Sequence, residues 1–82
     1  MLSNSIFSQS TKSADFHKDK AIDELMRGNK QIALIEIDES IKLDSNNADS
    51  FYLRGYIYQE LKDLNKALTN YNTALKLNPK QT

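Results

Sequence analysis

The sequence contains no cysteine, only two glycines and one proline, and no long hydrophobic run. Without cysteine, the chain can form neither a disulfide bond nor a thiolate metal site. Its longest purely apolar run, residues 32–35, is far shorter than the roughly 20 residues of a membrane-spanning helix. The first residues also lack a basic segment followed by an apolar core, so a secretory signal is not expected. We therefore expect a cytoplasmic protein that does not enter a membrane.

Charge of a single sign is also missing. The 11 basic side chains balance the 11 acidic ones, and no block of like charge stands out. Proteins that bind nucleic acids depend on clustered Lys and Arg to neutralise phosphates, so a nucleic-acid partner is not expected. With 82 residues, the chain forms at most one small domain, which is marginally stable by itself.

The scarcity of glycine and proline favours an all-α fold. Four helical segments are separated by short polar turns, and strand-like alternation is absent. Ser13, Asn29, Asn47 and Asp63 stand where N-caps belong, and Pro79 ends the last helix. The predicted helices span about 14–27, 30–43, 48–61 and 64–77. Because the turns are short, neighbouring helices should pack antiparallel.

Residues 1–13 are mostly Ser, Asn, Gln and Thr. This composition predicts a disordered polar tail. The alternative is a short docked segment, because Leu2, Ile6 and Phe7 would share one face of a helix.

The second and fourth helices end alike, in "ALIEIDESIKLDS" (33–45) and "ALTNYNTALKLNP" (67–79). The offset between the two segments is therefore 67 − 33 = 34 residues. It equals the period of tetratricopeptide repeats, which are helix–turn–helix units of about 34 residues. The chain resembles that family most closely over residues 48–81, where the pattern positions are Phe51, Arg54, Gly55, Tyr58, Ala67, Tyr71, Ala74 and Pro79.

Residues 14–47 resemble a degenerate copy of the same repeat. His17, Lys20 and Glu24 replace the usual apolar residues, although Ala21, Ala33 and the positions that follow fit the pattern. The resemblance implies two helix–turn–helix hairpins stacked as a short right-handed α-solenoid. It also places Gly55 opposite Ala67 at a close helix crossing, which explains a glycine inside a helix. The apolar seam of the second hairpin would then comprise Tyr58, Leu61, Leu64, Leu68, Tyr71 and Leu75.

The resemblance also implies a function, because such repeats bind peptides or partner helices in a groove lined by the first helix of each hairpin. The groove residues would be Asp15, Lys18, Ile22, Met26, Asp49, Tyr52, Tyr56 and Gln59. Tyr52 and Tyr56 lie four residues apart and are the predicted anchors; the alternative is that they only pack on neighbouring helices. We expect an adaptor that binds a protein or peptide partner.

Catalysis is not expected. His17 is the only histidine, and Asp15 and Asp19 lie two residues away from it, a spacing that does not bring helical side chains together. No glycine-rich phosphate loop is present. We therefore predict neither a catalytic residue nor a cofactor nor a metal.

The last helix should leave apolar side chains uncovered, because repeat arrays bury their core by stacking. Residues 14–47 carry a net charge of −3 (five basic, eight acidic) and residues 48–81 a net charge of +2 (five basic, three acidic). The opposite charges favour a homodimer, which makes a self-assembling scaffold the alternative function. The other alternative is that these residues are the start of a longer repeat array.

Overall fold

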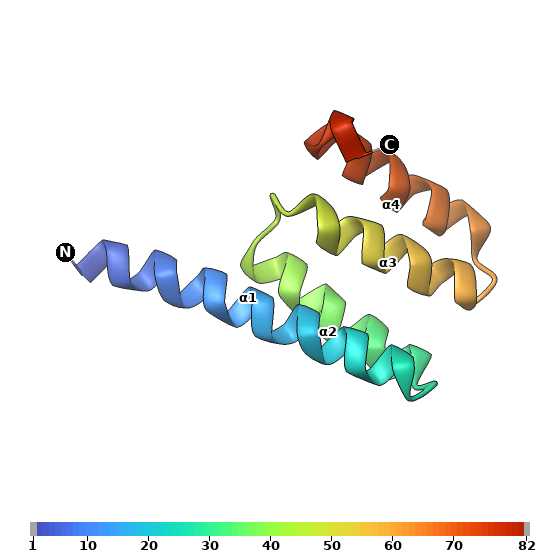
Figure 1. Cartoon of the computed structure of the whole chain (residues 1–82), viewed down its shortest axis with the longest axis horizontal. Helices are drawn as coiled ribbons and strands as arrows, with labels where there is room; N and C mark the ends of the chain where they lie inside the picture. The colour runs from blue at the N-terminus through green and yellow to red at the C-terminus, as the bar shows by residue number, and fades with distance from the viewer. Residues whose placement is uncertain (1, 82) are drawn as a thin grey trace.

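The computed structural model describes the backbone of residues 2–81 and the side chains of residues 12–80. Its helices are α1 (Leu2–Met26), α2 (Lys30–Leu43), α3 (Ala48–Glu60) and α4 (Leu64–Leu77), followed by the short 3-10 helix η1 (Pro79–Gln81). Figure 1 shows two antiparallel helical hairpins lying side by side, α1 with α2 and α3 with α4. This arrangement confirms the predicted all-α fold of stacked hairpins.

The two tight turns inside the hairpins have the same geometry. After α1, the amide of Asn29 donates to the carbonyl of Glu24 (2.8 Å); after α3, the amide of Asp63 donates to that of Tyr58 (2.9 Å). Such a bond spanning five residues requires a left-handed residue just before its donor. That residue is Gly28 (φ 85°) in the first turn and Lys62 (φ 67°) in the second.

Two of the four predicted N-caps form as expected. The side chain of Asn47 accepts a hydrogen bond from the amide of Asp49, and that of Asp63 accepts one from Lys66. The prediction for Asn29 is wrong, because its side chain instead donates to Glu24 Oε1 (2.9 Å). The prediction for Ser13 is also wrong, because α1 continues through it.

Helix α1 is longer than the sequence interpretation expected. Helix α1 begins at Leu2 rather than near Ala14, and in Figure 1 its first part extends beyond the end of α2. Residues 2–13 contain no glycine or proline that would break a helix. The side chains of Leu2, Ile6 and Phe7 lie outside the described residues, so the docked-segment alternative stays a prediction, as does the division into segments 1–13, 14–47 and 48–81.

The core forms where α2 packs between α1 and α3. Its centre consists of the buried side chains of Ala21, Ala33, Ile37, Ile41 and Ile57. Leu25, Leu34, Phe51, Leu53 and Leu61 pack around this centre and are partly buried. Ser40 adds a buried polar contact, since its hydroxyl donates to the carbonyl of Ala14 (2.7 Å) and ties α2 to α1.

The close crossing at Gly55 is confirmed. A Cβ atom at this position would lie 3.1 Å from the carbonyl oxygen of Ala67 and 2.8 Å from two ring carbons of Tyr71. Ordinary van der Waals contact between such atoms needs about 3.5 Å or more. The second hairpin therefore accommodates the Tyr71 ring only because residue 55 has no side chain.

The predicted apolar seam of the second hairpin is wrong for several leucines. Leu64 and Leu68 are 66% and 60% exposed, and Leu75 is also exposed. The residues of α4 that are buried are instead Ala67, Asn70 and Ala74. The leucines lie on the side of α4 that no other described helix covers, whereas the matching residues Leu34 and Ile41 of α2 are covered by the second hairpin.

Candidate functional site

The candidate site is the face that α1 and α3 form together. The two helices run in the same direction, because α2 lies between them and is antiparallel to both (Figure 1). Nζ of Lys30, just after α1, lies 3.5 Å from the carbonyl oxygen of Glu60 at the end of α3. We call this surface the α1–α3 face and define it by the eight predicted groove residues: Asp15, Lys18, Ile22 and Met26 on α1, and Asp49, Tyr52, Tyr56 and Gln59 on α3. All eight are exposed except Lys18, which is half-buried.

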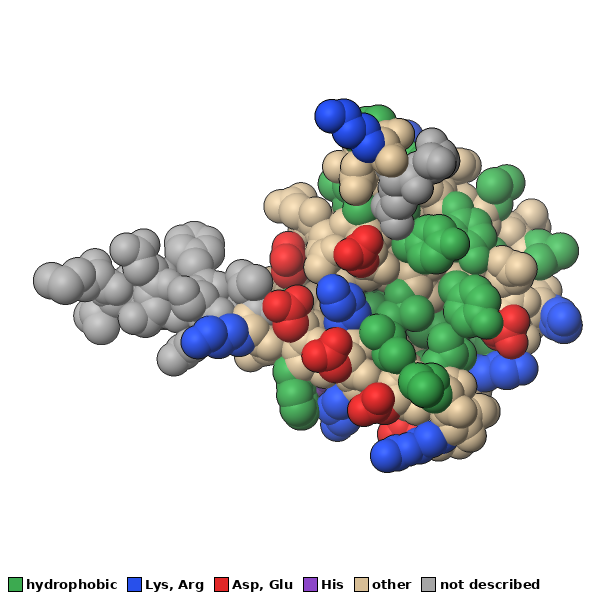
Figure 2. Space-filling view, viewed as in Figure 1, with side chains coloured by type: hydrophobic (Ala, Val, Ile, Leu, Met, Phe, Trp, Pro, Cys, Tyr) green, Lys and Arg blue, Asp and Glu red, His purple; other side chains and the backbone are tan. Residues whose placement is uncertain are grey.

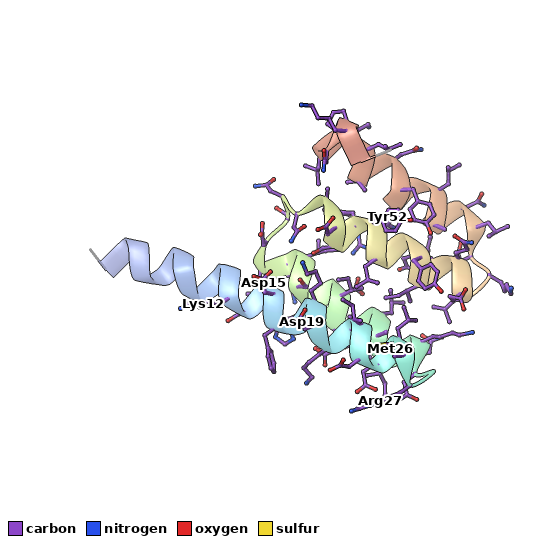
Figure 3. The ribbon with its side chains drawn as sticks, in the orientation of Figure 1. Lys12, Asp15, Asp19, Met26, Arg27 and Tyr52 are labelled. Carbon is purple, nitrogen blue, oxygen red and sulfur yellow. The ribbon has the colours of Figure 1, made fainter. Side chains whose placement is uncertain are left out.

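Half of the α1–α3 face is apolar. Ile22, Met26, Tyr52 and Tyr56 rank among the large hydrophobic side chains that remain exposed, and Met26 is 81% exposed. Figure 3 shows Met26 and Tyr52 on the same side of the molecule, from different helices. Figure 2 shows that hydrophobic side chains gather there into one patch over α3 and the last turns of α1. The structure thus places exposed apolar residues of both hairpins on one surface.

Tyr71 belongs to this surface although the sequence interpretation assigned it to the core. Its ring lies over Gly55 and packs against the ring of Tyr52, with centroids 5.2 Å apart. Its hydroxyl donates to Oε1 of Gln59 (2.8 Å). Burial raises the pKa of Tyr71, and the nearby Tyr52 and Tyr56 raise it further, so the phenol stays protonated and able to donate. Glycine at position 55, opposite an aromatic residue on the next helix, is the sequence signal for this arrangement.

The contacts of Tyr71 hold the aromatic part of the face in place. Aromatic pairs at this separation contribute about 0.5–1.5 kcal/mol beyond their buried area. Tyr52 is therefore supported from one side by Tyr71 and remains half exposed on the other. A supported and exposed aromatic ring loses little conformational entropy when a partner binds.

His17 takes part in a contact between helices α1 and α2. Its Nδ1 lies 2.7 Å from Oε1 of Glu36 on α2, and Nζ of Lys20 lies 3.5 Å from the other carboxylate oxygen. The hydrogen bond from His17 lowers the pKa of Glu36, and Lys20 adds to this while burial opposes it. Over the described side chains, no group of three or more His, Asp or Glu residues could hold a metal ion.

A hollow lies between α2, α3 and α4. It is open, with a volume of about 470 Å³, and is lined by Asp38, Ile41, Lys42, Arg54, Tyr58, Lys66, Thr69 and Asn70. Arg54 joins three helices there, because its Nε donates to Asn70 Oδ1 (2.7 Å) and its Nη1 to Asp38 Oδ1 (3.0 Å). These bonds engage the guanidinium in structural contacts, so we assign the hollow no ligand.

Comparison with known proteins agrees with this architecture. The tetratricopeptide repeat family matches residues 48–81, which are α3, α4 and the short helix that follows them. Residues 48–81 are a tetratricopeptide repeat. The matched segment contains Gly55, Ala67 and Tyr71, whose contacts form the crossing described above. The first hairpin, one repeat earlier in the chain, has the same helix order and turn geometry.

A human protein named protein O-mannosyl-transferase TMTC3 is 49% identical to this chain over 43 residues. The match covers 51% of this chain but 5% of that protein's length. Tetratricopeptide repeats are protein-interaction units. In the described residues, no helix is both long and apolar enough to cross a membrane.

Proposed function

We propose that this protein is a non-enzymatic interaction module that binds a peptide or helix of a partner protein on the α1–α3 face. The observation that carries the proposal is the apolar patch formed by Ile22, Met26, Tyr52 and Tyr56 from two different helices. Exposed apolar side chains that gather into one patch are typical of a binding surface. Its cytoplasmic location stays a prediction.

The two tyrosines have the properties of binding anchors. Each buries a large ring at low entropic cost and carries a hydroxyl that can donate to the partner's backbone. Tyr52 and Tyr56 are 52% and 41% exposed, so much of each ring is available. The exposed parts of the two rings contribute nothing to the core of the repeat. This supports a binding role for the tyrosines over a purely structural one.

The test is the double variant Tyr52→Ala/Tyr56→Ala. Partners captured by the wild-type protein should be lost, while far-ultraviolet circular dichroism should show nearly unchanged helicity. The matched control is Leu64→Ala/Leu68→Ala, which removes two similarly exposed apolar side chains from α4. The control variant should retain the partners. If the tyrosine variant captured the same partners as the wild type, the α1–α3 face would not be the binding surface.

The second candidate function is self-assembly through the last helix. Leu64, Leu68, Leu75 and Leu77 are exposed along α4, which carries two lysines and no acidic residue. The first hairpin has an excess of acidic side chains, so the two ends of two copies are complementary in charge. The resulting homodimer would bury the leucines. Light scattering at micromolar concentration distinguishes the two functions, because a monomer mass and a concentration-independent melting temperature would contradict self-assembly.

A further inference from the structure

The α1–α3 face has two chemically different ends. Asp15 and Asp19 lie toward the start of the packed part of α1, and Asp49 lies in the first turn of α3. Since α1 and α3 run in the same direction, these carboxylates belong to one end of the face. Figure 3 shows Asp15 and Asp19 on the same side as Met26 and Tyr52. The apolar patch lies nearer the other end, beside Asp23, which continues the acidic row of α1 and is also exposed.

The three carboxylates of the acidic end are exposed to solvent. Within the described side chains, none of them forms an ion pair, whereas Glu24, Glu36, Asp38, Glu39, Glu60 and Asp63 all do. Lys18 is the one cation among the eight residues of the face, and it is half-buried. The carboxylates thus outnumber it, and their charge is available to a partner.

We propose that the partner segment is a basic amphipathic helix, with Lys or Arg over the acidic end and apolar side chains over Tyr52, Tyr56, Ile22 and Met26. This inference rests on the proposed function and names the chemistry of its partner. Charge complementarity selects among partners and fixes their direction on a surface more than it adds to affinity.

The same charges argue against an acidic partner. A carboxylate-rich peptide would bring like charges to Asp15, Asp19 and Asp49, and such juxtaposition costs affinity. Lys18 and Lys12, the lysine one turn before Asp15, are fewer than these carboxylates. The face therefore distinguishes between two helices that carry identical apolar residues but opposite charges.

The test uses two fluorescently labelled synthetic helical peptides and the whole chain. Both peptides carry the same leucine and tyrosine face; one has lysines in its polar positions near one end, and the other has glutamates there. Fluorescence anisotropy at low salt should show that the lysine peptide binds at least about tenfold more tightly. The double variant Asp15→Asn/Asp19→Asn should weaken the lysine peptide about fivefold or more and reduce the difference between the peptides.

The matched control is Asp38→Asn/Glu39→Gln, which removes the same charge from α2, outside the α1–α3 face. It should leave both affinities within about twofold of wild type. Glutamate and lysine peptides that bind equally well, and that are both lost in Tyr52→Ala/Tyr56→Ala, would overturn the charge assignment while supporting the face itself.

Other outcomes test the underlying proposal. Undiminished binding of the lysine peptide to the tyrosine variant would overturn the proposed function along with this inference. Failure of the lysine peptide to bind the wild-type chain would overturn the inference. Excess unlabelled wild-type chain could displace the bound lysine peptide while the Leu64→Ala/Leu68→Ala variant does not. That result would show that α4 of a second copy occupies the face, and it would also overturn the inference.

Discussion

The two hairpins share one backbone plan and differ in what holds their helices together. In the first, His17 and Lys20 of α1 contact Glu36 of α2. In the second, Phe51 and Arg54 of α3 occupy the positions of His17 and Lys20, and Arg54 donates to Asn70, which stands where Glu36 stands. The same helix–turn–helix unit can therefore join its two helices at this position in two ways. The first hairpin uses ionic contacts to a carboxylate, and the second uses a hydrogen bond from an arginine to a side-chain amide.

The helix crossings differ in the same way. The first hairpin places Ala21, Ala33 and Ile37 at its crossing, all fully buried. The second places Gly55, Ala67 and Tyr71 at the matching positions. Glycine on one helix is thus paired with a larger side chain on the other. This exchange gives the second hairpin an aromatic ring that reaches the α1–α3 face, whereas Ile37 at the matching position of the first hairpin is fully buried.

The largest expected effect comes from adding a side chain at Gly55. Gly55→Leu should unfold the second hairpin, and Gly55→Ala should destabilise the protein by about 1–2 kcal/mol, because overpacking outweighs the roughly 1 kcal/mol by which alanine favours a helix. In a Tyr71→Ile background, which copies the first hairpin, Gly55→Ala should instead stabilise. Urea unfolding of wild type, Gly55→Ala, Tyr71→Ile and the double variant measures the effect of the alanine in both backgrounds. A Gly55→Ala effect of the same sign in both backgrounds would contradict the proposed exchange.

The next effect concerns Glu36 and its dependence on pH. Glu36→Gln should cost about 1 kcal/mol at neutral pH, because the carboxylate accepts from His17 and lies near Lys20. The pKa of Glu36 is lowered from 4.5 in the folded protein, so its ionised form contributes stability above that pH. This contribution is lost as the pH falls through the lowered folded pKa.

Unfolding of wild type and Glu36→Gln at pH 7 and pH 3 tests this sign. The stability difference between them should shrink at the lower pH. Glu39→Gln, on the same helix but more exposed, should show a smaller difference at both pH values. A gap that widens on acidification would contradict the assigned role of Glu36.

The smallest effect concerns the two tight turns. Both have a left-handed residue, and only the first uses glycine there. Lys62→Gly should stabilise the protein by about 0.5–1 kcal/mol, since a left-handed conformation is costly for residues with a Cβ atom. The reciprocal change Gly28→Lys should destabilise by a similar amount. Thermal denaturation of both variants checks the pair, and a loss of stability in Lys62→Gly would show that the lysine side chain has a role of its own.

Much of the fold could be predicted from sequence because its signals are local. The short polar turns determine where the helices break, and the repeat period aligns the hairpins. The burial of α4 could not be predicted in the same way. Leu68 and Leu34 occupy matching positions, but within the described residues a further hairpin covers only Leu34. Burial in a repeat protein depends on neighbours in space, which the local pattern does not contain.

The candidate site was predictable to a similar extent. Helical spacing correctly predicted that Tyr52 and Tyr56 are exposed on one side of α3. The position of Tyr71 was missed because the repeat pattern assigns that residue to the core. Its hydroxyl reaches Gln59 only because Gly55 leaves room for the ring. A contact that depends on the absence of a side chain is hard to infer without the packed structure.

Site-specific photo-cross-linking tests the central claim, binding on the α1–α3 face, most directly. A photoreactive phenylalanine analogue would replace either Tyr56 or Leu68, two exposed residues on different faces of the second repeat. The account predicts cross-links to a different protein from position 56 and not from position 68. Cross-links that form from position 68 while position 56 yields none would contradict it and would move the binding surface to α4.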